Sequence, residues 1–230
     1  MNKVSFNPFH SAATALHAWL REWRDYLGEL RYYTRPRFAL ADLLLAWLYL
    51  PHNAYRVSRT FLEQRGEADV FRYGETPLRI LAHIVKRCDL QPGHRFFELG
   101  CGRGRTCFWL HLVAGLTTFG IDYVPTFVHK AEWLKTRLLG DRQGLRFVLA
   151  DVRDVDFTTA DAVYLYGTGF DEGLIGDLIT AMADLHRDAW VITASYPLTD
   201  WPECTFLQLV DQIEVDYTWG RTHLYLHRRT

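Results

Sequence analysis

The sequence predicts an α/β fold in which helices cover both faces of a mostly parallel sheet. Three observations predict this class. From about residue 73 to the end of the 230-residue chain, short apolar segments alternate with helical segments. Before residue 73, the apolar residues recur at helical spacing. The last two apolar segments flank the turn sequence DYTWG, which favours a closing antiparallel hairpin.

The region 1–72 is predicted to be all-helical. In the segment HAWLREWRDYLGELRYY, large apolar side chains recur every three or four residues and give a helix one apolar face. Pro36 ends this helix, the apolar run 38–50 forms the next, and a third helix ends at Gly66. The run 38–50 is short for a membrane span. We therefore expect a buried helix there, with peripheral membrane contact as the alternative.

The region 73–230 is predicted to contain the sheet. We expect helices at 76–90 (with Thr76 as N-cap), 104–114, 125–140 and 170–186, and strands at 95–99, 117–122, 145–151, 161–167, 189–197, 205–215 and 221–229. The result is a Rossmann-like, seven-stranded, mostly parallel sheet with an antiparallel C-terminal hairpin. Ligands of such sheets bind at the carboxyl ends of the strands, near the point where the strand order reverses.

The composition excludes several classes of function. A net charge of −1 offers no support for a nucleic-acid partner. The four cysteines form no CxxC pair and have no histidines at zinc spacing nearby, so we expect no metal site and a reducing, cytoplasmic environment. The N-terminal residues lack a compact apolar run followed by a cleavage site, and a signal peptide is therefore not expected.

The segment RFFELGCGRGRT places Gly100, Gly102 and Gly104 between a predicted strand and a predicted helix. Glycines let the backbone turn sharply and let a ligand approach the main chain, and the start of a helix offers free N–H groups. Nucleotide cofactors and S-adenosylmethionine both exploit such loops. Cys101 lies within the loop, where we expect its small size to matter more than its nucleophilicity.

The spacing of the loop and its neighbour Glu98 favour S-adenosylmethionine. The dinucleotide fingerprint is G-x-G-x-x-G, whereas this loop reads G-x-G-x-G and lacks the lysine of a phosphate-binding loop. A carboxylate at Glu98 would repel a pyrophosphate, but it would attract a sulfonium cofactor that also carries an ammonium group. An NAD-linked oxidoreductase is therefore disfavoured.

Acidic residues follow the next two strands. Asp122 ends the second strand, where a carboxylate accepts hydrogen bonds from both ribose hydroxyls. Asp151 follows the third strand, where it would accept from an adenine amino group while Tyr123 or Val152 packs on the ring. The segment 164–170 follows the fourth strand, next to the expected position of the reactive methyl group. Two arginines that border the loop, Arg103 and Arg105, are expected to be solvated residues at a helix start.

From about residue 73 to 230, the chain resembles the class I, seven-strand S-adenosylmethionine-dependent methyltransferases. FELGCGRG is similar to their first motif, GIDYV to the ribose segment and ADVRD to the adenine segment. The segment YGETPLRILAHIVKRCDLQPGHRFFELGCGRG and the closing DYTWGRTHLYLHRR are similar to the non-SET histone-lysine methyltransferases, the disruptor-of-telomeric-silencing family. That resemblance implies that Tyr73, Glu75 and Thr76 form a loop over the methionine end of the cofactor, and that Phe170 lies near a lysine channel.

One position departs from that family. Where the family carries an Asn-Asn pair after the fourth strand, this chain has Tyr166 and Gly167, so the amide that would orient an amine is missing. The expected activity is methyl transfer, with a protein lysine as the preferred acceptor. Methylation of a small molecule at nitrogen or oxygen, with residues 1–72 as a lid, and a catalytically silent cofactor-binding module are the alternatives. The residues expected near the acceptor are Tyr73, Tyr166, Thr168 and Phe170, with Tyr166 also bordering the cofactor.

Overall fold

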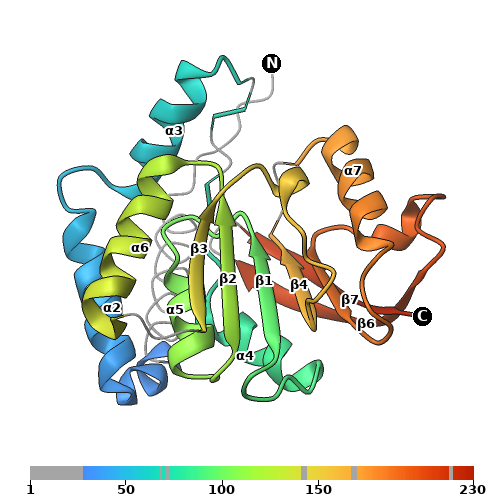
Figure 1. Ribbon diagram of the computed structural model, residues 1–230, viewed down its shortest axis with the longest axis horizontal. Coiled ribbons are helices and arrows are strands. Elements are labelled where there is room, and N and C mark those ends of the chain that lie inside the picture. The colour runs from blue at the N-terminus through green and yellow to red at the C-terminus, as the bar shows by residue number, and fades with distance from the viewer. Residues whose placement is uncertain (1–27, 68, 71–72, 141–143, 167–169, 218–219) are drawn as a thin grey trace, which may run out of the picture.

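The structure is a computed structural model that describes residues 28–67, 69–70, 73–140, 144–166, 170–217 and 220–230. Its helices and 3₁₀ turns are η1 (Arg31–Thr34), α2 (Pro36–Leu48), α3 (Ala54–Gln64), α4 (Leu78–Arg87), α5 (Arg105–Leu112), α6 (Pro125–Leu139), η2 (Val152–Asp154), α7 (Glu172–Met182) and η3 (Leu198–Asp200). Its strands are β1 (Arg95–Leu99), β2 (Thr117–Asp122), β3 (Leu145–Leu149), β4 (Ala162–Leu165), β5 (Trp190–Ala194), β6 (Leu207–Tyr217) and β7 (Gly220–Arg229). Figure 1 labels the helices α2 to α7 and the seven strands.

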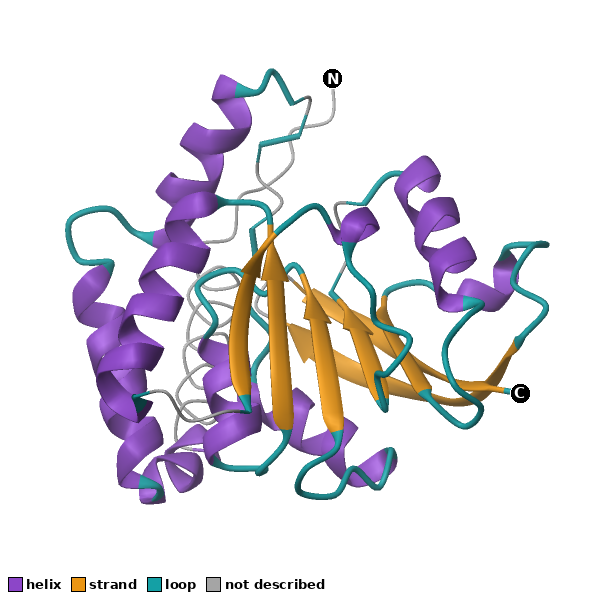
Figure 2. Ribbon diagram, viewed as in Figure 1, coloured by secondary structure: helices purple, strands orange, loops and turns teal. Residues whose placement is uncertain are grey.

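The seven strands form one sheet in the order β3-β2-β1-β4-β5-β7-β6. Strands β1 to β5 run parallel to one another, whereas β7 runs antiparallel to both β5 and β6. The sheet of seven mostly parallel strands with a C-terminal hairpin is therefore confirmed (Figure 2). Strand β1 has β2 on one side and β4 on the other, so the strand order reverses here and opens a crevice at the carboxyl ends of these strands.

Two apolar cores cover the faces of the sheet. The first joins Phe96 of β1 to Phe108 of α5 and Leu134 of α6, and it also includes Phe38 and Leu45 of α2. The second lies on the other face, under α7. Figure 1 shows α2 beside α6 at one flank of the molecule and α7 at the opposite flank. Helix α2 therefore packs in the same core as the sheet. The division of the chain between residues 72 and 73 does not separate two cores, and it stays a prediction.

Local signals define most of the helix ends. Pro36 and Pro125 open α2 and α6, where a missing N–H costs nothing. Asn53 and Asp171 cap α3 and α7, accepting hydrogen bonds from backbone N–H groups at 2.8 Å in both cases. The helix expected over HAWLREWRDYLGELRYY lies largely outside the described residues. The two later N-terminal helices are confirmed as α2 and α3.

The start of α4 differs from expectation, because Thr76 does not cap it. The Thr76 hydroxyl is buried and hydrogen-bonds the Tyr164 hydroxyl at 2.8 Å. The backbone N–H of Leu78, at the first turn, instead donates to the Glu29 carboxylate at 2.8 Å. A carboxylate 49 residues away thus satisfies a donor that a local cap would have satisfied, and the sequence pattern at 76 could not indicate this.

Candidate active site

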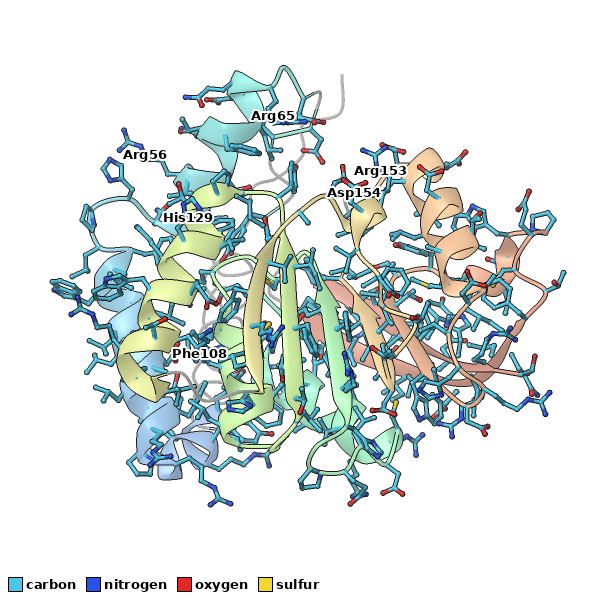
Figure 3. All side chains as sticks on the ribbon, viewed as in Figure 1. Arg56, Arg65, Phe108, His129, Arg153 and Asp154 are labelled. Carbon is cyan, nitrogen blue, oxygen red and sulfur yellow. The ribbon has the colours of Figure 1, made fainter. Side chains whose placement is uncertain are left out.

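A cleft with about 1150 Å³ of empty space, open to solvent, lies at the carboxyl ends of the parallel strands. Its lining includes nine of the residues expected from the sequence: Tyr73, Gly100, Gly102, Asp122, Tyr123, Asp151, Val152, Tyr166 and Phe170. Figure 3 labels Arg65 on α3 and Arg153 on η2, which line the cleft from its two sides. The cleft therefore occupies the place where doubly wound sheets bind their ligands.

A smaller cavity, whose roughly 260 Å³ of empty space includes open solvent, shares Gly74, Gly100 and Tyr166 with the cleft. Its lining adds Glu75, Thr76, Glu98 and Cys101, all expected at the site, together with Arg103, Arg105 and Thr106. Side chains of both charge signs therefore border this cavity. Of the remaining expected residues, Thr168 lies outside the described residues. Gly104 is not among the residues that line either space.

The three loop glycines have φ angles of +81°, +55° and +81°, values that residues with a Cβ rarely adopt. A Cβ at Gly102 would lie 2.9 Å from the Tyr73 ring, so this glycine lets that ring lie directly against the loop. A Cβ at Gly104 would lie 2.8 Å from Cζ of Phe147, and closer still to its Cε1. Gly104 thus allows α5 to pack against β3, whereas Gly100 and Gly102 face the cleft.

Asp122 is held at the end of β2 by the loop itself. Its Oδ2 accepts from the Gly102 N–H at 2.7 Å, and its Oδ1 accepts from the Val124 N–H at 2.9 Å. Burial raises the pKa of this carboxyl to about 6, although the backbone N–H groups that it accepts from lower it. The Tyr123 backbone N–H also lowers this pKa. A fixed, largely ionised carboxylate at the edge of the cleft suits vicinal hydroxyls as hydrogen-bond donors.

The Asp151 carboxylate is engaged by its neighbour Arg153. Its Oδ1 accepts from the Arg153 backbone N–H at 3.0 Å, and its Oδ2 pairs with the guanidinium at 2.7 Å. These hydrogen bonds hold the pKa of Asp151 below its ordinary value. Val152 is buried beside it and borders the cleft. The end of β3 therefore presents an apolar surface and an anchored carboxylate, and its contact with an adenine stays a prediction.

Glu98 is only 3% exposed and lies in the middle of the sheet, next to Gly120 of β2 and Tyr164 of β4. Its carboxylate accepts from the Thr106 hydroxyl at 2.7 and 2.8 Å, and from the Cys107 thiol at 3.1 Å. Burial raises the pKa of Glu98 to about 7 against the lowering effect of these bonds. The carboxyl is therefore partly protonated near neutral pH, and a cation in the smaller cavity would favour its ionised form.

The segment 73–76 is fastened to the glycine loop by Arg103. The Tyr73 hydroxyl donates to Glu75 Oε1 at 2.5 Å. Arg103 forms a bidentate ion pair with the Glu75 carboxylate, with Nη2 at 2.9 Å from Oε2. Although burial works to raise the pKa of Glu75, the hydrogen bonds and charge of Arg103 bring it below its ordinary value. The expectation that Arg103 is solvated was wrong, because Glu75 draws its guanidinium over the cavity.

Arg105 was also expected to be solvated, and its side chain is only 13% exposed. Its guanidinium bonds Asp42 Oδ1 at 3.0 Å, Glu29 Oε2 at 3.1 Å and the Tyr33 hydroxyl at 3.0 Å. Tyr33 also donates to Asp42. The first turn of a helix disfavours cations, and Arg105 opens α5. Carboxylates from elsewhere in the chain offset its charge there.

Several aromatic side chains lie near the point where the cleft and the smaller cavity meet. The Tyr166 ring lies 5.3 Å from the Tyr217 ring, and the Tyr73 ring lies 5.2 Å from the Phe127 ring. A Cβ on Gly74 would lie 3.0 Å from two ring carbons of Tyr166 and closer still to its hydroxyl, so the segment 73–76 rests on Tyr166. Phe170 completes the aromatic part of the lining.

Sequence reasoning missed the contribution of α3 to the cleft. Ser58, Leu62 and Arg65 of this helix line it, and Phe61 of α3 packs at 5.4 Å on Tyr123. Helical spacing in the sequence indicated that α3 exists, but it could not indicate which part of the sheet the helix covers.

Within the described residues, no group of three or more His, Cys, Asp or Glu side chains gathers as a metal site would need.

Comparison with solved structures gives the fold. MtNAS, solved in complex with MTA and tNA, is 14% identical with a TM-score of 0.54, and the match covers 66% of this chain and 60% of that chain. TrmN from Thermus thermophilus is 19% identical with a TM-score of 0.57, over 69% of this chain and 50% of that one. An RNA methyltransferase from Salinibacter ruber, solved with S-adenosyl-L-homocysteine, is 20% identical with a TM-score of 0.52, over 66% and 91%. This chain thus spans less than two thirds of the first two proteins.

Comparison with families gives a more specific result. The family described as "Histone methylation protein DOT1" matches residues 62–195, more than half of the chain. The matched segment begins in α3, ends just after β5, and contains the glycine loop, Asp122, Asp151 and Tyr166. No protein in a curated collection matches the chain.

Proposed function

The chain belongs to the DOT1 family of histone methylation proteins, and on this premise we propose that it transfers a methyl group from S-adenosyl-L-methionine to the side-chain amine of a protein lysine. Its fold is that of the class I methyltransferases. The observation that carries the proposal is that the cleft and the smaller cavity meet at the carboxyl ends of the parallel strands. The larger space is lined by the glycine loop and by the Asp122 carboxylate, and the smaller one has charges of both signs.

The residues present fit such a cofactor. In the larger cleft, Asp122 would hold the ribose hydroxyls, and Val152 and Tyr123 would border the adenine ring. The methionine end of the cofactor carries one ammonium and one carboxylate. Glu98 would face the ammonium, and Arg103 would face the carboxylate, since both border the smaller cavity. Gly100 borders both spaces and would let the cofactor pass close to the main chain.

When bound, the cofactor supplies a methyl group on a sulfonium, which is already activated for transfer. The chain then has to align the acceptor, exclude water and keep the amine neutral. An apolar, aromatic surround lowers the pKa of an amine, because it disfavours the ammonium form. Tyr73, Tyr166 and Phe170 provide such a surround, and their ring faces would also stabilise the methylated cation. Alignment of two reactants lowers a barrier by roughly 7–11 kcal/mol in favourable cases.

One observation favours a small-molecule acceptor as the second candidate. Tyr166 is the residue at the end of β4, where an amide was expected to orient a lysine amine, and α3 covers the cleft from the N-terminal side. A tyrosine hydroxyl accepts a hydrogen bond from an amine as an amide oxygen does, so the substitution is compatible with lysine. The cover that α3 gives the cleft is what favours the second candidate, because a small molecule with a nitrogen or oxygen nucleophile would be enclosed beneath it.

The test is transfer of a tritiated methyl group from the cofactor to a cell lysate. We expect the full chain to label protein bands, and hydrolysis of those bands to release methylated lysine. Asp122→Asn should abolish the label, whereas Arg221→Met, at an exposed ion pair on β7, should retain it. Label that passes only into the small-molecule fraction would establish the second candidate. Cofactor binding without any label would identify a catalytically silent module.

A further inference from the structure

Helix α2 presents an apolar face to solvent. Leu40, Leu43 and Trp47 are 46%, 66% and 61% exposed, and their spacing of three and four residues places them on one side. Leu50, in the turn just after the helix, is 76% exposed. We call these four residues the α2 face. The opposite side of the helix carries the fully buried Phe38, Ala41 and Leu45. A surface helix of a globular protein normally turns a polar side outward, so this apolar side needs a separate explanation.

The exposed charges near the α2 face are mostly positive. Arg35 and Arg37 are exposed where α2 begins, and Arg56 and Arg59 are exposed on α3, just after the turn that ends the face. Figure 3 shows Arg56 at the outer side of this flank. Of the acidic residues of the two helices, Asp42 bonds Arg105 in the interior, and Glu63 pairs with Arg59 and offsets its charge. The net positive charge of this flank therefore comes from Arg35, Arg37 and Arg56.

The length of α2 decides how it would meet a bilayer. Its 13 residues span about 20 Å, well below the roughly 30 Å of a hydrocarbon core. No helix within the described ranges combines the length and apolar character needed to cross a membrane. Helix α2 is apolar all round, but its Phe38 side is buried in the core and only the α2 face meets solvent. An exposed side of leucines and a tryptophan, with arginines at its ends, suits the plane of a membrane surface.

A second copy of the chain is a poorer occupant of the face. Two copies that met through the same face would be related by a two-fold axis, so each face would meet itself. The arginines at the two ends of the face would then approach those of the partner copy, where like charges repel. An anionic lipid surface satisfies the same arginines, and their guanidinium groups suit lipid phosphates.

We propose that the α2 face docks on the surface of a bilayer that contains anionic phospholipids. Leu40, Leu43, Trp47 and Leu50 enter the boundary between headgroups and acyl chains, while Arg35 and Arg37 contact the phosphates. Helix α3 follows α2 directly and lines the cleft through Ser58, Leu62 and Arg65, so docking brings the cleft close to the membrane. The proposal concerns where the chain works, and it stands independently of methyl transfer.

Sedimentation of the full chain with lipid vesicles tests this. We expect co-sedimentation with phosphatidylcholine vesicles that contain about 30% phosphatidylglycerol, weaker co-sedimentation with pure phosphatidylcholine, and loss of binding as salt rises from about 50 to about 500 mM. The double variant Leu43→Ser/Trp47→Ser should weaken the partitioning at least tenfold. Arg35→Gln/Arg37→Gln should weaken it by about fivefold for each arginine removed.

A matched control is available on the far hairpin, where Leu209 and Val210 of β6 are 37% and 54% exposed. Leu209→Ser/Val210→Ser removes two exposed apolar side chains that lie outside the α2 face, and it should leave vesicle binding unchanged. Circular dichroism confirms that every variant is folded. Failure of the folded wild-type chain to sediment with anionic vesicles would overturn the proposal. An equal loss of vesicle binding in the control variant would also overturn the proposal. A wild-type dimer in analytical ultracentrifugation that Leu43→Ser/Trp47→Ser converts to monomer, without vesicle binding, would assign the face to a second copy.

Discussion

At the scale of single residues, the Glu98 carboxyl is protonated in the folded chain over a pH range in which an exposed glutamate is ionised. Burial raises its pKa from 4.5 to about 7. Between these values the folded chain binds more protons than the unfolded chain. Stability therefore falls as pH rises through this window, and Glu98 contributes no further pH dependence above it.

We expect the free energy of unfolding of the wild-type chain to fall by about 2 kcal/mol more than that of Glu98→Gln between about pH 5 and pH 7. The reason is that an amide does not titrate. Urea titrations of both proteins at the two pH values measure this difference. The pKa of Asp122 is also raised, so this residue lowers stability as pH rises in both proteins. Its contribution therefore cancels from the difference between their free energies of unfolding. Parallel stability profiles would show that Glu98 is ionised in the fold.

The contact between Gly74 and Tyr166 gives a second prediction at this scale. A Cβ at Gly74 would lie 3.0 Å from ring carbons of Tyr166 and nearer to its hydroxyl, so Gly74→Ala should push the tyrosine out of place. We expect Gly74→Ala to weaken binding of the cofactor at least tenfold with little loss of stability. Adding Tyr166→Phe removes the hydroxyl and should restore part of the affinity. Independent, additive effects in this double-mutant cycle would exclude the steric coupling.

The residues at the strand ends could be predicted because their positions follow from local sequence. Gly100, Gly102 and Asp122 come directly after segments that are recognisable as buried strands, and parallel strands bring those ends together. Arg103 and Arg105 could not be placed in this way. Their partners lie 28, 63 and 76 residues away, and no local pattern connects a helix start to carboxylates at that separation.

At the scale of elements, the strand and helix positions were predicted closely where glycine or proline marks an end. β1 and β2 match the expected ranges, and α6 runs from Pro125 to the residue before Gly140. The position of α3 over the cleft could not be predicted, because the helix makes long-range contacts that its own periodicity does not encode. The all-round apolar character of α2 is visible in the sequence, but only the fold shows which side faces solvent.

The Arg105 guanidinium joins three elements and should therefore matter to stability. It connects Glu29 and Asp42 of the N-terminal region to the start of α5, while Glu29 also accepts from the start of α4. We expect Arg105→Met to lower the free energy of unfolding by roughly 3–5 kcal/mol, because it leaves two largely buried carboxylates without a counter-charge. Urea denaturation measures the loss.

The matched control for this variant is Arg221→Met. Arg221 also pairs with two carboxylates, Glu214 and Asp216, but all three side chains are more than half exposed. Solvent screens such pairs, so the urea midpoint should stay where it is in the wild-type chain. Equal effects of the two substitutions would mean that the Arg105 network adds no more than a surface ion pair.

At the scale of the whole molecule, the N-terminal helices and the sheet share one core. Phe38 and Leu45 of α2 pack in the same apolar cluster as Phe96 of β1 and Phe108 of α5. We therefore expect a single unfolding transition in urea, with tryptophan fluorescence and far-ultraviolet circular dichroism giving the same midpoint. Two separate transitions would show that the N-terminal region is a domain of its own.

The most direct test of the proposed function is isothermal titration calorimetry of the full chain with S-adenosyl-L-methionine and, separately, with NAD. We expect one molecule of S-adenosyl-L-methionine to bind per chain, no heat of binding from NAD, and at least tenfold weaker cofactor binding to Asp122→Asn, which loses a charged acceptor for the ribose hydroxyls. Binding of NAD, or the absence of any heat from S-adenosyl-L-methionine with the folded chain, would contradict the assignment of the cleft.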